Sequence, residues 1–356
     1  MADNQIGKAK KRCFSIWLPY VRGGSGSDVY TRRLAEALTA YGHTVHVQEF
    51  HHAFQYAPFL LKSISPPSGV DIAIANSWNA FAFRRRGVKL IAVEHHCVFD
   101  PAYNAYRSVP QRVFHGLMVR RFERWSFGSA DCVLAVSEYT AAVVSRLFQL
   151  PDVTVVLNAI ETQFYTPGER DDAPPTGPFR LLFVGNLSRR KGADLLEPVM
   201  TRLGQGFELV YTRGLRKVSP LPPAVNMTAL APLSDEALRE EYRRADALIF
   251  PSRLEGFGYC AAEALSCGTP VVASRSSSLP ELVEHGVTGS LCRQDDVSAF
   301  VEAIRSLAKD RRKLASMSAS ARSQAAERFS METMAVKYSE VFESLGVCPR
   351  TGQESL

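Results

Sequence analysis

The amino-acid sequence predicts an α/β protein made of two doubly wound parallel sheets. Short apolar runs rich in β-branched residues alternate with longer amphipathic stretches, which is the βαβ pattern of a parallel sheet. This pattern stops once, at the Pro- and Gly-rich run 166–178, and then starts again. The length of 356 residues fits two domains of ordinary size. We therefore predict two Rossmann-like domains that face a central cleft.

The first half contains six predicted strands and one well-defined helix. Each strand is a short apolar run, and the strands lie at residues 14–18, 44–50, 70–75, 88–94, 132–137 and 153–157. Between residues 28 and 41, apolar side chains recur every three or four positions, as on the buried face of a helix. Ser27 is placed to cap the start of this helix, and Gly42 is placed to end it.

The second half repeats the organisation of the first. We expect strands at residues 181–185, 207–211, 247–251 and 271–274, helices at 193–203, 234–245 and 257–267, and helix throughout from residue 297. The predicted domains are residues 1–165 and 180–330, with a linker at 166–179. Residues 331–356 form a C-terminal helix that we expect to cross back to the N-terminal domain.

The composition favours a globular cytoplasmic protein. Charged residues make up 22% and hydrophobic residues 46% of the chain, which excludes a largely disordered protein. The seven cysteines are scattered, without Cys-x-x-Cys spacing, and favour reduced thiols over disulfides or a zinc site. No apolar run approaches the ~18 residues that a membrane span requires. The net charge of +6 does not indicate a nucleic-acid partner.

A glycine-rich loop follows the first predicted strand. Gly24 and Gly26 match the first part of the Gly-x-Gly-x-x-Gly pattern, but Val29 takes the place of the third glycine. Glu49 ends the second strand, where a dinucleotide-binding fold has its ribose-binding acid. Three interpretations stay open: a phosphate-binding loop, a nicotinamide cofactor site, and a turn with a structural role only.

A basic turn follows the predicted strand at 181–185. Asn186, Arg190 and Lys191 lie in this turn, immediately before a predicted helix. Adjacent cations at a helix start can clamp a diphosphate through charge-assisted hydrogen bonds. The alternative is a basic loop that only faces solvent.

Two acidic residues follow the predicted strand at 247–251. Glu255 lies in the strand-to-helix loop, and Glu263 lies eight positions later, about two turns into an apolar helix. A carboxylate inside such a helix needs a hydroxyl or a cation as its partner. A sugar or ribose hydroxyl and a structural salt bridge to an arginine both meet this need.

The stretch that begins at Glu255 resembles the signature of family 4 retaining glycosyltransferases, which have the GT-B fold. Seven residues separate Glu255 from Glu263, and Ala-Leu-Ser-Cys-Gly-Thr-Pro-Val-Val-Ala follows. The glycine loop at 23–26, the pair Val136-Ser137, the run 158–160 and the turn at 184–192 resemble other motifs of the family in the same order. The resemblance covers essentially the whole chain. Asn158-Ala159 and Tyr259-Cys260 depart from the family pattern without removing a charged group.

The resemblance implies roles for the acidic pair and the loop between them. Glu263 would hold the ribose hydroxyls of a nucleotide, and Glu255 would face the transferred sugar and take part in catalysis. The amides of Phe257 and Gly258 would lie beside the sugar hydroxyls and the diphosphate.

The resemblance also implies a diphosphate site. Arg190 and Lys191 would neutralise the leaving diphosphate, Asn186 belongs to the same turn, and the loop around Gly24 would complete the anion site. Enzymes of this family need no metal for chemistry, and the sequence has no Asp-x-Asp pair. We therefore expect no metal or other cofactor.

The family places a histidine just past the fourth strand of its first domain, beside the sugar. His95 and His96 occupy this place here. Because adjacent strand residues point to opposite faces, we expect only one of them to face the cleft, with His95 slightly favoured. The alternative is a buried histidine bonded to backbone.

The charge is concentrated in the first half of the chain. Residues 1–160 contain 18 Lys and Arg but 11 Asp and Glu, whereas the remainder contains 24 and 25. Several of these cations alternate with apolar and aromatic residues: Arg84, Arg85, Arg86, Arg107, Arg112, Arg120, Arg121 and Arg124 with Phe114, Leu117, Met118, Phe122 and Trp125. This combination suits an anionic, lipid-linked acceptor and contact with the inner face of the cell membrane. An ordinary amphipathic helix with a buried apolar face is the alternative.

The resemblance, together with these features, implies a retaining, metal-independent hexosyltransferase. It would move a hexosyl unit from a nucleoside diphosphate sugar to an acceptor hydroxyl in envelope polysaccharide, lipopolysaccharide or glycolipid synthesis. Two other functions stay open. One is a nucleotide-sugar-binding protein without catalytic activity, and the other is an NAD(P)-dependent oxidoreductase, which would leave Glu255 and Glu263 unexplained.

Overall fold

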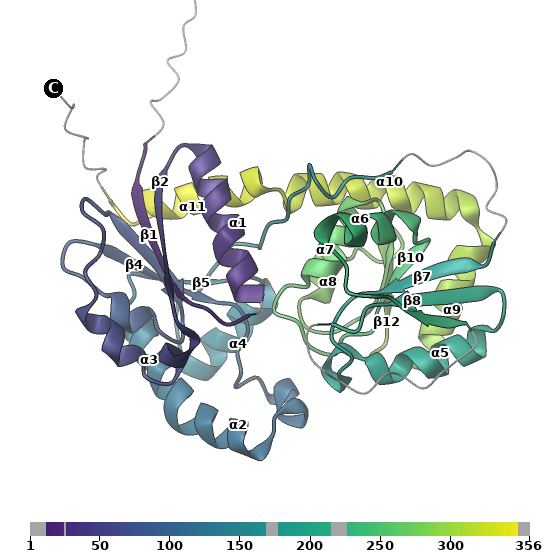
Figure 1. Ribbon diagram of the computed structural model, residues 1–356, viewed down its shortest axis with the longest axis horizontal. Helices are drawn as coiled ribbons and strands as arrows, with labels where there is room; N and C mark the ends of the chain where they lie inside the picture. The colour runs from purple at the N-terminus through teal and green to yellow at the C-terminus, as the bar shows by residue number, and fades with distance from the viewer. Residues whose placement is uncertain (1–11, 25, 169–176, 215–225, 348–356) are drawn as a thin grey trace, which may run out of the picture. The chain divides into compact units, whose positions relative to one another are not determined.

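A computed structural model of the chain describes residues 12–24, 26–168, 177–214 and 226–347 (Figure 1). These residues form two six-stranded sheets, with strand orders β2-β1-β3-β4-β5-β6 and β12-β11-β10-β7-β8-β9. Neighbouring strands pair in parallel, and helices connect them, which confirms the predicted α/β class. In the described part of the chain, no helix is both long and apolar enough to span a bilayer.

The first sheet follows the predicted order of elements. Its strands are β1 (Ser15–Val21), β2 (Thr44–Phe50), β3 (Ile72–Asn76), β4 (Lys89–Glu94), β5 (Cys132–Ala135) and β6 (Thr154–Val155). Its α-helices are α1 (Gly26–Tyr41), α2 (Val109–Phe114), α3 (Arg120–Ser129) and α4 (Glu138–Phe148), and shorter 3₁₀ segments include η1 (His52–Gln55), η2 (Pro58–Ser63), η3 (Ala80–Phe83) and η4 (Pro101–Tyr106). Strands β3 and β4 are buried along most of their length, as expected for a parallel sheet covered on both faces.

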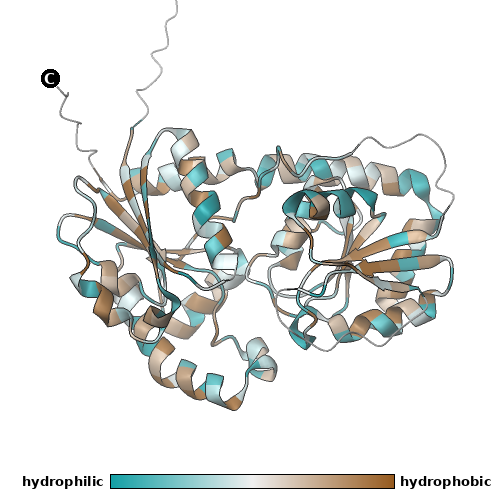
Figure 2. Cartoon of the chain, viewed as in Figure 1, coloured by the Kyte–Doolittle hydropathy of each residue, from teal (hydrophilic) through white to brown (hydrophobic). Residues whose placement is uncertain are grey.

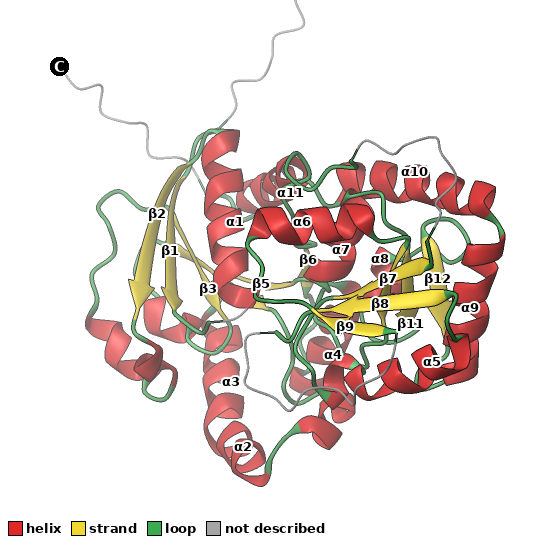
Figure 3. Cartoon of the chain, turned by 45° about the vertical axis from the view of Figure 1, so that its right-hand side comes forward, coloured by secondary structure: helices red, strands yellow, loops and turns green. Residues whose placement is uncertain are grey.

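The second sheet has the same organisation. Its strands are β7 (Phe179–Phe183), β8 (Phe207–Tyr211), β9 (Met227–Ala229), β10 (Ala247–Phe250), β11 (Val271–Ser274) and β12 (Gly289–Cys292). Its helices are α5 (Leu196–Leu203), α6 (Asp235–Arg244), α7 (Tyr259–Ser266), α8 (Leu279–Leu282), α9 (Val297–Lys309) and α10 (Arg311–Arg328). The last helix, α11 (Met331–Ser344), belongs for most of its length to the first of the two units described below. Figure 3 shows α5 and α6 on opposite sides of this sheet.

The core of the second sheet is apolar on the face that α5 and α9 cover. Leu181, Phe183 and Ile249 of the strands pack in one cluster with residues of both helices, among them Met200 and Phe300. The strands are correspondingly brown in Figure 2. Each fully buried side chain of this kind stabilises the fold by about 1.5–3 kcal/mol relative to an exposed one.

The contacts divide the chain into two compact units. The first contains Met1–Val93, Phe122–Val133 and Ala335–Leu356, and the second contains Glu94–Arg121 and Leu134–Met334. Within the first unit, α11 packs against α1, since the hydroxyl groups of Tyr338 and Tyr30 are hydrogen-bonded. The domain limits drawn from the sequence stay a prediction, and residues 169–176 of the predicted linker lie outside the described residues.

The start of α1 differs from the expectation. The helix begins at Gly26, so Ser27 lies inside its first turn and is not the cap. The carboxylate of Asp28 instead accepts the N–H groups of Gly23 at 3.1 Å and Gly24 at 2.7 Å. A charged carboxylate is a stronger acceptor than a serine hydroxyl, and it folds the glycine loop back onto the helix.

The sequence did not predict two of the strands, β9 and β12. β9 has three residues at the edge of its sheet, too few to show a period. β12 begins with Gly289, a residue type that usually weakens a strand. Here glycine is needed, because a Cβ at this position would lie 2.1 Å from the carbonyl oxygen of Val271 on the neighbouring strand.

Candidate active site

The strand order brings the basic turn and the acidic loop together. β7 and β10 are neighbours, with Leu181 opposite Ala247. The turn at 184–192 follows β7 and the loop at 251–258 follows β10, so both lie at the carboxyl edge of the sheet. The chain also reverses its winding direction between these strands, which is where open α/β sheets bind their ligands.

The turn after β7 is fastened to the loop after β10 by backbone contacts. The N–H of Arg253 donates to the carbonyl oxygen of Arg190 at 2.9 Å, and the hydroxyl of Ser252 donates to the same oxygen at 3.3 Å. Gly192 has a φ of +71°, and a Cβ there would lie 2.1 Å from the carbonyl oxygen of Pro251. Only glycine combines this backbone conformation with so close an approach. The turn after β7 and the loop after β10 are therefore packed tightly together.

Glu255 is a buried carboxylate held between two cations. Its Oε1 lies 2.5 Å from Nζ of Lys191 and accepts the hydroxyl of Ser252 at 2.6 Å, while Oε2 lies 3.8 Å from Nη1 of Arg190. Its side chain is 8% exposed. Burial alone would raise the pKa of Glu255, but the charges of Lys191 and Arg190 and these hydrogen bonds lower it below its ordinary value. The carboxylate is therefore ionised at neutral pH.

Arg253 anchors the same loop and was not singled out from the sequence. Its guanidinium donates to both carboxylate oxygens of Asp194, at 2.6 and 2.9 Å, and to Asp295 at 2.6 Å. The hydrogen bond from Arg253 to Asp194 is the main cause that raises the pKa of this arginine. A bidentate pair of this kind fixes orientation as well as position. Its partners are 59 and 42 positions away, so no local pattern indicates it.

The loop from Glu255 to Gly258 is also held from the segment after β11. The N–H of Glu255 donates to the hydroxyl of Ser277 at 2.9 Å, and the hydroxyl of Ser278 donates to the carbonyl oxygen of Phe257 at 2.8 Å. Gly258 has a φ of +110° and immediately precedes α7. The first-turn N–H groups of a helix have no partner within the helix, so this is an anion-attracting end.

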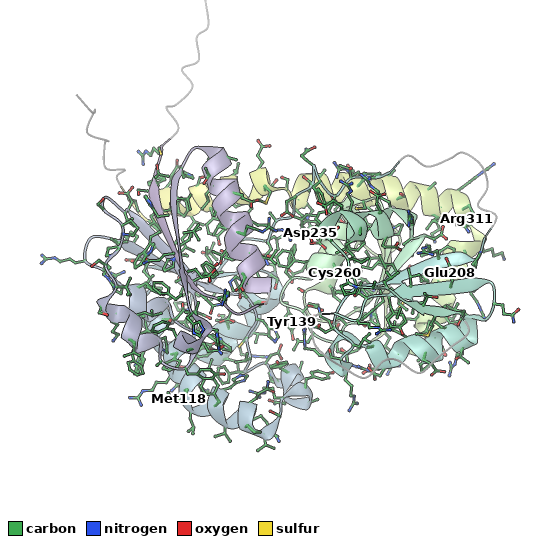
Figure 4. All side chains as sticks on the ribbon, in the orientation of Figure 1. Met118, Tyr139, Glu208, Asp235, Cys260 and Arg311 are labelled. Atoms are coloured by element: carbon green, nitrogen blue, oxygen red, sulfur yellow. The ribbon has the colours of Figure 1, made fainter. Side chains whose placement is uncertain are left out.

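Glu263 lies on α7 and is 7% exposed. The hydroxyl of the fully buried Tyr242 donates to its Oε2 at 3.0 Å. Burial raises the pKa of Tyr242 well above its ordinary value, so this hydroxyl stays protonated and remains a donor. Burial, followed by the charge of Glu263, also raises the pKa of Cys260 to about 12, and Lys191 and Glu255 act on the same thiol. Cys260, labelled in Figure 4, lies on α7 as Glu263 does.

His95 and His96 both lie beyond the last residue of β4, so the alternation of a strand does not decide which one faces the site. Burial lowers the pKa of both imidazoles to about 4, which leaves them neutral at pH 7. Arg190, Glu255 and Lys191 also act on the pKa of His96.

Each histidine makes a different contact with this part of the protein. The carbonyl oxygen of His95 faces Gly256, where a Cβ would lie 1.8 Å away. The His96 ring meets Tyr103 edge-on at 5.0 Å. Nε2 of His96 is buried and has no hydrogen-bond partner among the described residues. The structure thus places His96 beside the charged cluster, while the choice of the functional histidine stays a prediction.

Gly24 and Asn186 are the remaining donor-site residues predicted from the sequence. Gly24 belongs to the first unit, and its N–H is already accepted by Asp28 at 2.7 Å. Asn186 lies in the turn after β7, where its Oδ1 would be 2.2 Å from a Cβ added to Gly214. Across the described ranges, no three His, Cys, Asp or Glu side chains are arranged to hold a metal ion.

The chain matches two family models. The model described as glycosyl transferases group 1 matches residues 221–324, and the model for glycosyltransferase family 4 matches residues 48–164. Both matches agree with the resemblance drawn from the motifs.

Among curated relatives, the chain is 30% identical over 267 residues to the lipopolysaccharide core biosynthesis mannosyltransferase LpsB of Rhizobium meliloti, covering 65% of this chain and 72% of that one. It is 28% identical over 305 residues to D-inositol 3-phosphate glycosyltransferase 1 of Catenulispora acidiphila, covering 75% and 71%. It spans only 56% of the length of a third relative, the glycogen synthase of Mycobacterium tuberculosis, at 30% identity over 63% of this chain.

Solved structures share the fold. The sucrose-phosphate synthase of Thermosynechococcus elongatus superposes with a TM-score of 0.77 at 20% identity, covering 94% of this chain and 99% of that one. The UDP-glucose complex of HepE from Anabaena gives a TM-score of 0.70 at 17% identity, covering 92% and 99%. This chain belongs to glycosyltransferase family 4, and it is a glycosyltransferase with the GT-B fold.

Proposed function

We propose that this enzyme moves a hexosyl unit from a nucleoside diphosphate sugar to an acceptor hydroxyl, with retention of configuration and without a metal ion. The observation that carries the proposal is the ionised, buried Glu255 between Lys191 and Arg190 at the carboxyl edge of the second sheet. A neutral ligand would not need two cations beside this loop, whereas the negative charge of a diphosphate does need them. The HepE structure, which has the same fold, holds UDP-glucose and supports this class of donor.

Lys191 and Arg190 stabilise the negative charge of the leaving diphosphate. As the bond between sugar C1 and the diphosphate oxygen breaks, negative charge grows on the diphosphate, and Lys191 and Arg190 stabilise it from fixed positions. Arg190 is held because Nη1 donates to the carbonyl oxygen of Leu254 at 2.6 Å. The N-terminal end of α7 adds its dipole to the same effect. These groups take the place that a divalent cation holds in metal-dependent transferases.

The acidic pair supplies acceptors for hydroxyl groups. Glu263, ordered by Tyr242, accepts the ribose hydroxyls of the nucleotide, and Glu255 accepts a hydroxyl of the transferred sugar. His96 has a pKa of about 4 and is neutral, so its imidazole contributes a hydrogen bond to the sugar, not a positive charge.

The acceptor hydroxyl attacks C1 from the face that the diphosphate leaves. Its oxygen forms the new bond to C1, and its proton passes to the departing phosphate oxygen, so that atoms and charge balance. Attack on this face retains the anomeric configuration. Proton NMR of the product tests this step, because an inverted anomeric signal would contradict it.

A thermal-shift screen with UDP-, GDP-, ADP- and dTDP-glucose and the corresponding mannose donors tests the donor class. A ligand at 100 times its Kd stabilises the folded state by about 2.7 kcal/mol, which is a readily measured shift. Transfer or slow donor hydrolysis by the responding pair, unchanged by 5 mM EDTA, is the expected result. Binding without either reaction would favour the nucleotide-sugar-binding alternative.

An NAD(P)-dependent oxidoreductase is less well supported. Glu49, the candidate ribose-binding acid of that alternative, accepts the hydroxyl of Tyr20 at 2.5 Å and lies 3.4 Å from Arg22. Val29 still stands where the third glycine of the dinucleotide pattern belongs. A thermal shift with NADH or NADPH and none with any nucleotide sugar would favour the oxidoreductase.

We also propose an anionic, lipid-linked acceptor in envelope polysaccharide, lipopolysaccharide or glycolipid synthesis, reached from the inner face of the cell membrane. The residues from Val109 to Ser129 form one helical run through α2, a π-helical turn (His115–Val119) and α3. Its exposed side chains are both apolar and basic: Val109, Val113, Leu117 and Trp125 with Arg112, Arg120, Arg121 and Arg124. A soluble helix normally buries its apolar side chains, so this combination favours an anionic lipid surface.

Two of the cations predicted for this surface have partners within the protein. Arg84 is paired with Asp131, and Arg85 donates to the carbonyl oxygen of Ala82 at 3.0 Å beneath the ring of Trp17. Phe122 is buried, as in an ordinary amphipathic helix. The membrane proposal therefore rests mainly on the exposed arginines of α2 and α3.

Binding to liposomes with 30% anionic lipid at low salt tests this surface. Each arginine near such a surface contributes about 1 kcal/mol, so replacing Arg120, Arg121 and Arg124 by Ala should weaken binding roughly 100-fold. The control replaces Lys309, Arg312 and Lys313, three exposed cations of α9 and α10, and should change binding little. Equal losses in both triple variants would show that only net charge matters.

A further inference from the structure

The carboxylate of Glu281 caps a helix that belongs to a distant part of the chain. Glu281 lies on α8, and its two oxygens accept the N–H groups of Glu138 and Tyr139, each at 2.8 Å. These are the first two residues of α4, whose first-turn N–H groups have no partner within the helix. A negative charge at this end also interacts favourably with the helix dipole. We call this pair of hydrogen bonds the clasp.

The α8 side of the clasp leads directly to the acidic loop of the active site. Ser277 and Ser278 immediately precede α8. Ser277 accepts the N–H of Glu255 at 2.9 Å, and Ser278 donates to the carbonyl oxygen of Phe257 at 2.8 Å. Movement of α8 would therefore move the loop that carries Glu255.

The α4 side of the clasp leads to the segment that carries the histidines. The hydroxyl of Tyr139, labelled in Figure 4, donates to Oδ2 of Asp100 at 2.5 Å. Asp100 lies four residues after His96 and is one of the charges that act on its imidazole. Thr140, the next residue of α4, donates to the carbonyl oxygen of Gly256 at 3.5 Å.

The histidine segment and the acidic loop also touch directly, and the contact tolerates little displacement. The carbonyl oxygen of His95 lies so near Gly256 that an added Cβ would be 1.8 Å from it. One short contact does not fix the orientation of two segments, because they can still rotate about it. The clasp supplies a second, charged point of attachment.

We propose that Glu281 is a positioning residue that holds the histidine segment in register with the Glu255 loop. This inference rests on the proposed function, since it assigns the reacting sugar to the space between these two segments. The clasp joins α4, which follows a strand of the first sheet, to α8, which follows a strand of the second. Lys191, Arg190 and Glu263 are one step further from the clasp: Lys191 and Arg190 bond to Glu255 and Leu254 of the acidic loop, and Glu263 lies on α7.

This division gives a specific kinetic expectation. Glu281→Ala should lower kcat at least 10-fold, while the Kd of the nucleotide sugar changes less than twofold. The probe is the sugar nucleotide with the largest thermal shift among UDP-, GDP-, ADP- and dTDP-glucose, and the readout is release of its nucleoside diphosphate. Glu281→Gln keeps one acceptor oxygen and should retain an intermediate kcat.

Two control variants separate positioning from simple stabilisation. Ser137→Ala removes the hydroxyl that accepts the N–H of Thr140 at 3.1 Å, which weakens the cap of α4 without touching α8. Glu284→Ala removes an exposed carboxylate three residues from Glu281. Both should keep kcat within about twofold of wild type. Tyr139→Phe removes the link to Asp100 and should lower kcat in the same direction as Glu281→Ala.

The experiment distinguishes failure of the positioning role of Glu281 from failure of the proposed function. If the wild-type enzyme binds none of the nucleotide sugars, the proposed function fails. If it turns over and Glu281→Ala keeps its kcat, the positioning role is wrong. Equal losses from Ser137→Ala and Glu281→Ala, or parallel losses of kcat and donor affinity, also overturn it. Should Glu281→Ala not fold, Tyr139→Phe decides the question by the same comparison of kcat with Kd.

Discussion

The ion pair between Lys191 and Glu255 leads to a prediction about stability as well as activity. Replacing Lys191 by Met leaves a carboxylate that is 8% exposed without its partner at 2.5 Å. Removing one member of a buried pair destabilises a protein by about 3–5 kcal/mol. Arg190, at 3.8 Å, and the hydroxyl of Ser252 remain close to Glu255, so we expect the lower end of this range.

A double-mutant cycle isolates the pair. Lys191→Met, Glu255→Gln and the double variant are unfolded in urea at pH 7, followed by circular dichroism. The expected coupling energy is about 2–3 kcal/mol. Lys337 and Glu340 form an exposed control pair at 2.8 Å, for which we expect less than about 1 kcal/mol. A coupling for the buried pair no larger than for this control would refute the electrostatic interpretation of the site.

The pH dependence of the same variants gives an independent check. The pKa of Glu255 is lowered in the folded protein, so the pair contributes its full stability above the unfolded pKa of about 4.3 and loses it as the pH falls through the folded value. In Lys191→Met, burial without this cation favours the protonated carboxyl group. The difference in stability between wild type and variant should therefore shrink as the pH falls from 7 to 4.

Three further predictions concern neighbouring residues. Burial lowers the pKa of His96 to about 4, so the unfolded chain binds more protons than the folded protein between pH 4 and 6.5. The free energy of unfolding should therefore fall as the pH drops through this window, by up to about 3 kcal/mol for this residue. His96→Gln should flatten that fall in urea titrations. Tyr242→Phe removes one hydrogen bond to Glu263 and should weaken nucleotide binding roughly 10-fold in calorimetry, with kcat little changed. Gly256→Ala places a Cβ 1.8 Å from the carbonyl oxygen of His95 and should destabilise the protein by about 2–3 kcal/mol. The control Gly116→Ala has open space around the added Cβ and should not destabilise it. Equal melting temperatures of the two variants would contradict this packing.

Much of the secondary structure was predictable because its signals are local. The limits predicted for β2, β8 and β11 agree with the structure, since each strand is a short run rich in β-branched or aromatic residues. The predicted start of α1 was two residues late, and Asp28 acts from inside the helix by accepting the N–H group of Gly24 in the preceding loop. β12 was missed because its glycine is required by a neighbouring strand, which a local pattern does not show.

The candidate site divides in the same way. Arg190, Lys191, Glu255 and Glu263 were found because charged residues next to buried strands, at a recognisable spacing, indicate ligand chemistry. The residues that hold them were not found. Arg253 binds Asp194 across 59 positions, and a tyrosine inside an amphipathic helix gives no sign that its hydroxyl orders a distant glutamate.

From the sequence alone came the two sheets, the family and the charged residues of the site, because periodicity and motif spacing are carried by residues near one another in the chain. Only the tertiary structure shows that β7 and β10 are neighbours, that the Lys191 ammonium forms an ion pair with the Glu255 carboxylate, and that Glu281 caps α4. Such contacts depend on strand order and on the packing of segments that are far apart in the chain, from 64 residues for Lys191 and Glu255 to 143 for Glu138 and Glu281. Burial alone would raise the pKa of Glu255, and the charges of Lys191 and Arg190 lower it instead, so even the charge of the site is a property of the folded chain.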